Sequence, residues 1–150
     1  MKPITFSCKE TLEFAPEDIA QRILDLSNWI DFKGFGPIPG IRCAMFEVRT
    51  PEIVGSLIRV TNTDGSKHVE QIIEWQPDHR LRLLMKDFST PLSRLATGFE
   101  ETWEFERVGN ETKITRSFQL HARSILARPL LWIIVFFLKK AITRHLQQMR

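Results

Sequence analysis

The sequence predicts an α+β fold in which a curved, seven-stranded antiparallel sheet wraps around a long C-terminal helix. Alternating apolar and polar residues indicate one strand at 4–14 and six more between residues 41 and 123. Two short helical segments separate the first strand from the others. An amphipathic helix follows Ser124, and it is the largest apolar element left to cover the apolar face of such a sheet.

Length and composition indicate one folded domain spanning residues 1–150. Hydrophobic residues make up 43% of the chain and charged residues 26%, which excludes a disordered or fibrous chain. Two cysteines, Cys8 and Cys43, are too few for a disulfide framework or a four-cysteine zinc site, and we expect both to be buried free thiols. The first ten residues lack an apolar stretch, and the longest apolar run has ten residues against the roughly 20 that span a bilayer. We therefore expect a cytoplasmic protein.

Charge is divided unevenly along the chain. Residues 1–111 contain 13 Lys and Arg against 18 Asp and Glu, whereas residues 112–150 contain eight basic residues and no acidic one. This asymmetry is compatible with an acidic ligand, a membrane surface or a solvated basic end. Nucleic acid is not expected as a partner, because the basic residues are interleaved with a large apolar run.

The first strand and the two short helices follow from local patterns. In the strand at 4–14 the apolar residues alternate with polar ones, but Glu10 falls on the apolar side. Pro16 suits the first position of a helix, and Ser27 is positioned to cap a second one. Residues 33–40 hold three glycines and two prolines, so we expect a loop there. That loop is either a mobile lip over a pocket or a plain connector.

The remaining strands are expected at 41–49, 55–62, 67–76, 80–88, 98–107 and 112–123. A two-residue turn at Asp64-Gly65 would pair Ile58 with Gln71, which turns Gln71 inward. The same register places Arg59 opposite Glu70 on the solvent face.

A second two-residue turn is indicated at Gly109-Asn110. It pairs Trp103 with Arg116 and Glu101 with Phe118, and it places the apolar residues of both strands on one face. Glu101 then lies diagonal to Arg116, within reach of an ion pair.

The C-terminal helix carries apolar residues at spacings of three and four. The stripe consists of Leu131, Val135, Leu138, Ile142, Leu146 and Met149. Residues 130–138 are apolar all round, which predicts that these turns are buried on more than one side.

Several local patterns resemble a known family. They are Ala15–Asp18 followed by Ser27-Asn28-Trp29, the segments 55–61 and 70–77, and Trp103-Glu104-Phe105. With the order of elements, they make residues 3–149 similar to the START/Bet v 1-like (SRPBCC) superfamily, in particular its polyketide cyclase/dehydrase and lipid-transport branch. The resemblance implies the helix-grip fold and an internal cavity for a lipid, isoprenoid, sterol-like or polyketide-like molecule. Some members are cyclases or dehydratases, and many only bind and carry.

Polar residues on the expected inner face suggest a site. A charge that faces an apolar interior costs several kcal/mol unless it is paired or touches water, and a water-filled cavity relieves that cost. We therefore expect Arg116, with Glu101 and Glu10, to anchor a ligand, unless they form only an internal salt bridge. The expected ligand-binding residues are Gln71, Trp75, Met85, Glu101, Trp103, Phe105, Arg116, Phe118, Leu131, Ile134 and Val135.

Three functions remain open. The first is a carrier or sensor of a hydrophobic small molecule. The second is a cyclase or dehydratase without metal, in which Glu10 or Glu101 takes a proton and Arg116 polarises a carbonyl. The third is a membrane-surface or dimerising protein that uses the C-terminal helix, which an exposed Trp132, Phe136 and Phe137 would favour.

No metal or cofactor is expected. The sequence lacks the usual nucleotide-binding, phosphate-binding and hydrolase motifs. The four histidines lie in different elements and mostly on expected outer faces, which disfavours a metal site. They are His68, His79, His121 and His145.

Overall fold

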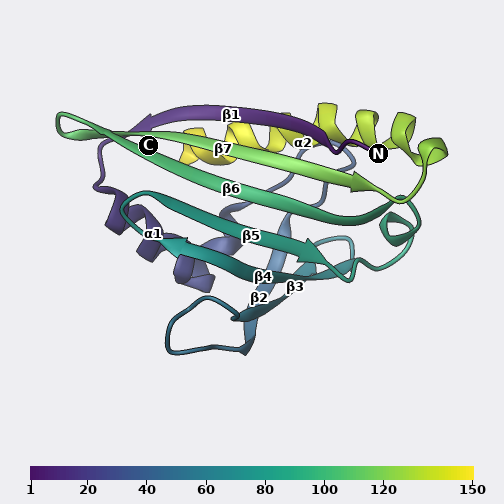
Figure 1. Ribbon diagram of the computed structural model, residues 1–150, viewed down its shortest axis with the longest axis horizontal. Coiled ribbons are helices and arrows are strands. Elements are labelled where there is room, and N and C mark those ends of the chain that lie inside the picture. Colours follow the sequence, from purple (N-terminus) through teal and green to yellow (C-terminus); the bar gives the residue numbers. More distant parts are fainter.

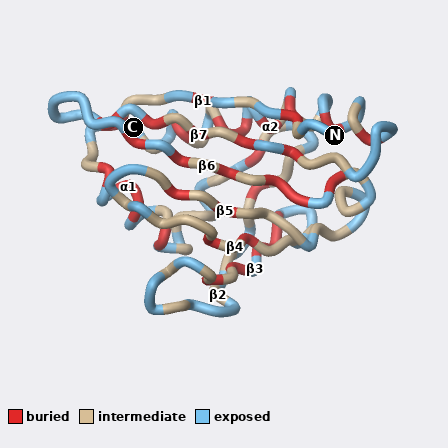
Figure 2. The backbone as a smooth tube through the Cα atoms, in the orientation of Figure 1, coloured by how far each residue is buried: buried red, intermediate tan, exposed pale blue.

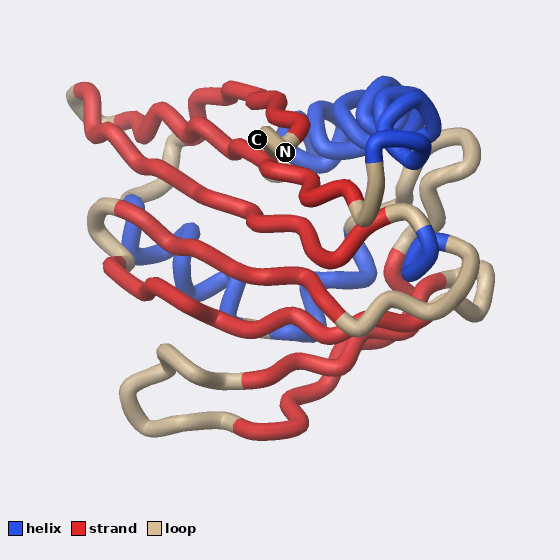
Figure 3. The backbone as a smooth tube through the Cα atoms, turned by 45° about the vertical axis from the view of Figure 1, so that its right-hand side comes forward, coloured by secondary structure: helices blue, strands red, loops and turns tan.

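A seven-stranded antiparallel sheet forms the body of the computed structural model, which describes residues 1–150. The strand order is β1-β7-β6-β5-β4-β3-β2, so every strand pairs with its sequence neighbour except that β1 pairs with β7. The sheet curves, and the helices lie on one side of it (Figures 1 and 3). The strands are β1 (Ile4–Leu12), β2 (Ile41–Val48), β3 (Leu57–Asn62), β4 (Lys67–Gln76), β5 (Arg80–Lys86), β6 (Ala96–Val108) and β7 (Glu111–Ala122).

Helices follow β1, β5 and β7. The α-helices are α1 (Pro16–Leu24) and α2 (Arg128–Gln148), and the 3-10 helices are η1 (Leu26–Asp31), η2 (Leu92–Arg94) and η3 (Ile125–Ala127). No helix combines the length and hydropathy that crossing a bilayer requires. This arrangement confirms the predicted seven-stranded sheet with two short helices after the first strand and a long helix at the end of the chain.

The cap of the second short helix differs from the prediction. Pro16 does occupy the first turn of α1. The cap of η1, however, is Asp25, whose carboxylate accepts hydrogen bonds from the backbone N–H of Ser27 at 3.1 Å and from its hydroxyl at 2.7 Å. Asp25 is the cap because η1 begins two residues earlier than a cap at Ser27 would predict, which places Ser27 inside the helix.

The β3–β4 hairpin has a three-residue turn, so its predicted register was wrong by one residue. The backbone N–H of Asn62 donates to the carbonyl of Ser66 at 2.8 Å, and Gly65 adopts a positive φ of 87°. Such a turn ends in a left-handed residue, and it shifts every pair along the two strands. Ile58 therefore lies opposite Glu70 rather than Gln71.

This shift exchanges the two faces of β4. Glu70 is buried instead of exposed, and Arg59 pairs with Glu47 at 2.8 Å on the surface rather than with Glu70. Gln71 faces the other side of the sheet, where its side-chain oxygen accepts a hydrogen bond from Lys86 at 3.0 Å. The prediction that Gln71 points inward is wrong.

The β6–β7 hairpin confirms the predicted register. Trp103 lies opposite Arg116, and Glu101 lies opposite Phe118. Glu101, Trp103, Arg116 and Phe118 are all buried on the inner face. This hairpin is the part of the sheet that carries the expected anchor.

Helix α2 lies beside the edge strand β1 and covers only part of the sheet (Figure 1). Its predicted stripe is buried from Leu131 to Leu146, and Met149 is partly buried. Figure 2 shows short buried and exposed stretches alternating along the helix, as expected when one side of each turn is buried. The prediction that 130–138 are buried on more than one side is wrong, because only one side of the helix meets the sheet. Four apolar side chains in this segment are more than half exposed: Leu130, Trp132, Ile133 and Phe136.

The cysteines have different surroundings. Cys8 is buried between β1 and α2, with its thiol 3.4 Å from the hydroxyl of Thr143. Cys43 is exposed on β2, which corrects the expectation that both thiols are buried.

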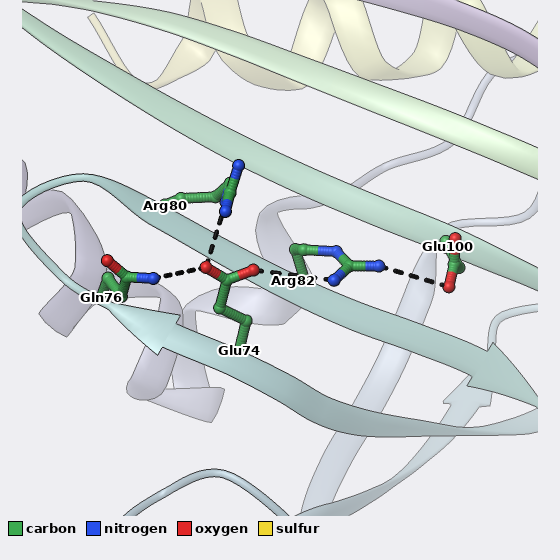
Figure 4. Close-up of polar contacts among 5 residues, drawn as sticks. All are labelled: Glu74, Gln76, Arg80, Arg82 and Glu100. Atoms are coloured by element: carbon green, nitrogen blue, oxygen red, sulfur yellow. Dashed lines mark hydrogen bonds and ion pairs between the residues drawn. The ribbon is translucent and has the colours of Figure 1, made fainter.

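Ion pairs cover the outer face of the sheet. Glu74 contacts Arg80 at 3.1 Å and Arg82 at 3.7 Å, and Arg82 reaches Glu100 at 3.5 Å (Figure 4). Gln76 also donates to Glu74. Desolvation acts to raise the pKa of Glu74, but the hydrogen bonds and charges of these neighbours outweigh it and lower that pKa.

Candidate functional site

A cavity of about 990 Å³ lies between the inner face of the sheet and α2. Its walls come mainly from β4, β5, β6 and β7, from η1, from the loop at 33–40, from residues 88–92, and from α2 between Ile134 and Gln148, with smaller contributions from α1, β2 and β3. The volume is at the upper end of the range for small-molecule sites. Because α2 lies at the sheet edge, the middle of the inner face is left uncovered, and this is where the cavity forms.

Six of the eleven expected ligand-binding residues line this cavity. They are Met85, Glu101, Trp103, Arg116, Phe118 and Ile134. Five of them lie on strands β5, β6 and β7, and Ile134 lies on α2. The β6–β7 register, which places Arg116 next to Glu101, is the reason that the sequence predicts this part of the site.

The other expected residues lie elsewhere. Leu131 and Val135 belong to the buried stripe of α2, and Phe105 lies in the core at the end of β6 that α1 covers. Trp75 packs partly buried against the core beyond a β-bulge in β4. Gln71 is on the outer face, as described above.

Glu10 also lies outside the cavity. Its carboxylate approaches Arg150 at 3.7 Å and accepts a hydrogen bond from the backbone of Thr11 at 3.1 Å. It therefore does not join Arg116 and Glu101, and its expected place in the anchor is wrong.

Arg116 is the centre of a buried polar cluster. Its Nε donates a hydrogen bond to Glu101, and Nη1 lies 2.9 Å from Nδ1 of His145. The guanidinium also lies over two aromatic rings, 4.3 Å from the centre of Trp103 and 5.6 Å from that of Phe118. An ion pair, a hydrogen bond to a neutral acceptor and two cation–π contacts together hold the guanidinium in place.

The protonation states of the cluster follow from burial. Burial, together with the positive charge of Arg116, lowers the pKa of His145 to about 3. His145 is therefore neutral near pH 7, and because Nδ1 accepts from Arg116, its proton is on Nε2. Burial also raises the pKa of Glu101; the charge of Glu70 adds to this effect and that of Arg116 opposes it.

A second polar pair lines the same cavity. Nε2 of His68 lies 2.8 Å from a carboxylate oxygen of Glu70, and both side chains are largely buried. The His68 ring packs near Phe88, which in turn packs on Phe99. The cavity therefore combines two buried polar pairs, Arg116–Glu101 and His68–Glu70, with aromatic walls.

Sequence reasoning missed three of these residues. Glu70 and His68 were placed outward because the β3–β4 turn was taken to be one residue shorter than it is. His145 was not singled out as a site residue, yet it lies seven residues after Leu138 and three after Ile142, on the buried stripe. That spacing was the available signal.

The loop at 33–40 forms part of the cavity wall through Lys33, Pro37, Ile38 and Pro39. Two backbone hydrogen bonds of 2.9 Å join Phe35 and Ile38, and the Phe35 ring stacks on Phe137 of α2. The loop is therefore a lip attached to the helix, and its mobility stays a prediction.

Comparison with solved structures identifies the fold. Ara h 8.0201 superposes with a TM-score of 0.66 at 16% identity, covering 97% of this chain and 98% of that one. A START superfamily protein from Mycobacterium smegmatis gives 0.66 at 12% identity, covering 97% and 99%. The chain has the START/Bet v 1 fold.

A further neighbour supports the same START/Bet v 1 architecture. Major latex-like protein 151 from Panax ginseng has a TM-score of 0.64 at 10% identity, covering 97% of this chain and 98% of that one. No protein-family model matches the sequence, and no curated protein matches it. The likeness at these identities is one of fold.

Proposed function

We propose that this protein binds a hydrophobic small molecule, such as a lipid, an isoprenoid or a polyketide-like compound, and acts as its carrier or sensor. The fold is that of START/Bet v 1 ligand-binding proteins, which supports hydrophobic ligand binding in general. The observation that carries the proposal is the cavity of about 990 Å³ with the Arg116 cluster on its wall.

Apolar contact supplies the affinity. Burying about 400 Å² of apolar ligand surface contributes roughly 10 kcal/mol before the costs of binding, at about 25 cal/mol per Å². Side chains such as Met85, Phe99, Ile134 and Leu138 offer that contact from both the sheet and α2.

The charge balance favours a neutral polar group on the ligand. Arg116 is already paired with Glu101, and a second carboxylate, Glu70, lies in the same wall. A ligand carboxylate would have to compete with Glu101 for the guanidinium. A hydroxyl or carbonyl would not, and it would find a donor in the Nε2–H of the neutral His145.

Tryptophan fluorescence tests this proposal, because Trp29 and Trp103 line the cavity. A long-chain alcohol and the matching fatty acid are titrated into the protein at pH 7.5. The proposal predicts saturable binding of both, with the alcohol at least as tight as the acid. No saturable binding of either compound contradicts a hydrophobic site, and much tighter binding of the acid contradicts the neutral anchor.

A cavity variant provides the control. Arg116→Met combined with Glu101→Gln removes both charges without leaving one unpaired in the wall. Without Arg116, Nδ1 of His145 is no longer held as an acceptor and Nε2–H is no longer fixed as the donor to the ligand. The variant should therefore bind the alcohol about fivefold more weakly, the value of one hydrogen bond at roughly 1 kcal/mol. The outer-face variant Arg82→Met should leave the affinity unchanged, since Arg82 contacts only Glu74 and Glu100 on the other side of the sheet.

A second candidate, a cyclase or dehydratase, is favoured by one observation. His68 and Glu70 form an acid–base pair in the cavity wall, which a proton abstraction next to a carbonyl requires. His145 is the poorer base, because its pKa of about 3 lies far from neutral pH. Turnover of a linear poly-β-ketone that is lost in Glu70→Gln would support the enzyme, and equal turnover in both proteins would exclude this pair.

A further inference from the structure

The outer side of the α2 region holds half of the large apolar side chains that the chain exposes. Twelve such side chains are exposed in the whole molecule, and six of them fall between residues 125 and 136. We call these six the α2 patch: Ile125, Leu126, Leu130, Trp132, Ile133 and Phe136. Soluble proteins rarely expose so many neighbouring apolar side chains unless the surface binds something.

Positive charges border the α2 patch. Arg123 precedes it, Arg128 lies between Leu126 and Leu130, and Lys139, Lys140 and Arg144 follow it on α2. No acidic residue occurs between residues 112 and 150. None of these five cations forms an ion pair within the chain.

We propose that the α2 patch docks onto an anionic membrane surface. A helix lying in the interface buries its apolar face at the boundary of headgroups and acyl chains, while its cations meet the lipid phosphates. The exposed apolar side chains of α2 and the cations that follow them have this arrangement. Residues 130–138 are too short an apolar run to span the bilayer, so contact is confined to the surface.

The charge pattern favours a membrane over a second copy of the chain. A two-fold dimer through the α2 patch would bring the cations that border the patch on one copy near those that border it on the other. With no acidic residue in 112–150 to compensate, those contacts would be repulsive. An anionic lipid surface compensates the same charges.

The α2 patch also adjoins the wall of the cavity. The Nζ of Lys140 lies 4.5 Å from the ring centre of Phe136 and 5.4 Å from that of Phe35. Phe35 belongs to the lip at 33–40, which lines the cavity. Docking would therefore hold this lip close to the lipid surface. Transfer of a ligand at that surface rests on the proposed function, whereas docking itself does not.

Vesicle co-sedimentation of the ligand-free protein tests docking directly. Vesicles of phosphatidylcholine alone are compared with vesicles that also contain 30% phosphatidylserine. The proposal predicts at least tenfold tighter binding to the anionic vesicles and loss of that preference at high salt. The proposal is overturned if the protein binds neither kind of vesicle, or if it binds both kinds equally well.

Matched variants assign the contact to the α2 patch. Ile133→Gln with Phe136→Gln removes apolar contact, and Lys139→Gln with Lys140→Gln removes charge; each pair should weaken binding by about tenfold or more. The control, Val108→Gln with Lys113→Gln, makes the same kinds of change at exposed positions of the β6–β7 hairpin and should bind as the wild type does. Equal effects of the control and the α2 variants would contradict the assignment.

Trp132 gives a spectroscopic readout of the contact in the wild-type protein. It is exposed on the α2 patch, whereas Trp103 is buried. Brominated acyl chains should quench the wild type, and Trp132→Phe should remove most of that quenching. Unchanged quenching in Trp132→Phe would overturn the proposal, and so would a stable dimer in analytical ultracentrifugation that vesicles fail to dissociate.

Discussion

Nη1 of Arg116 lies 2.9 Å from Nδ1 of His145, so one buried polar contact joins the middle of the sheet to the C-terminal helix. The two residues are 29 positions apart in sequence and meet across the cavity wall. Because Arg116 also binds Glu101, the cluster couples β6, β7 and α2. The stability of the fold and the polarity of the cavity therefore depend on the same three side chains.

Stability should depend on the protonation of His145. Its pKa is about 3 in the folded protein, below the 6.5 of an unperturbed histidine, so the unfolded chain takes up the proton first as pH falls. The contribution of neutral His145 is therefore complete above pH 6.5 and is lost as pH decreases from 6.5 toward 3. Chemical denaturation between pH 7 and pH 4 measures this loss. As pH falls, the free energy of unfolding of His145→Gln should decline less steeply than that of the wild type, by up to about 1.4 kcal/mol per pH unit. Parallel curves would show that His145 does not titrate in this way.

Breaking the Arg116–Glu101 pair should destabilise the protein strongly. Arg116→Met leaves the Glu101 carboxylate buried without its partner, and we expect the free energy of unfolding to fall by about 3–5 kcal/mol. Adding Glu101→Gln should recover a large part of that loss, because the unpaired charge is removed. Urea denaturation of the two variants measures the difference, and a double variant no more stable than Arg116→Met would contradict a buried ion pair.

Two neighbouring residues test the register of β4. Glu70 is buried and bonded to His68, whereas Gln71 lies on the outer face. Glu70→Ala should cost about 1–3 kcal/mol, because His68 loses its partner. Gln71→Ala should stay within about 0.5 kcal/mol of the wild type. The reverse order in thermal denaturation would indicate the alternative register.

Packing of the lip on α2 can be tested at two glycines with positive φ. Both Gly36 and Gly65 have a positive φ. An alanine at either position would have to adopt a left-handed backbone conformation, which costs about 1–2 kcal/mol. A Cβ at Gly36 would also lie 3.0 Å from the ring of Phe137, whereas one at Gly65 would meet no atom within 4 Å. Gly36→Ala should therefore lower Tm more than Gly65→Ala does, and equal Tm values would mean that the lip is not held against Phe137.

The sequence predicted the fold class and half of the site because both hairpin strands at Gly109-Asn110 share one pattern. Apolar residues and the Glu101–Arg116 pair agree on a single register there. The Asp64-Gly65 dipeptide fits turns of two or three residues, and β4 carries apolar residues on both faces, so periodicity did not decide between them.

The position of α2 could not be read from its periodicity. Spacings of three and four identify the side of the helix that is buried, from Leu131 to Leu146, but not which part of the sheet it meets. Its place beside β1 determines that Leu131 and Val135 enter the core, that Ile134 and His145 face the cavity, and that Trp132 faces outward.

Native mass spectrometry of the protein after exposure to a long-chain alcohol tests the central claim most directly. We predict a one-to-one complex for the wild type and its loss in Ile134→Trp, whose larger side chain would occupy the cavity that Ile134 lines. A wild-type protein that retains no hydrophobic molecule, or an Ile134→Trp variant that retains it equally well, would contradict ligand binding in this cavity.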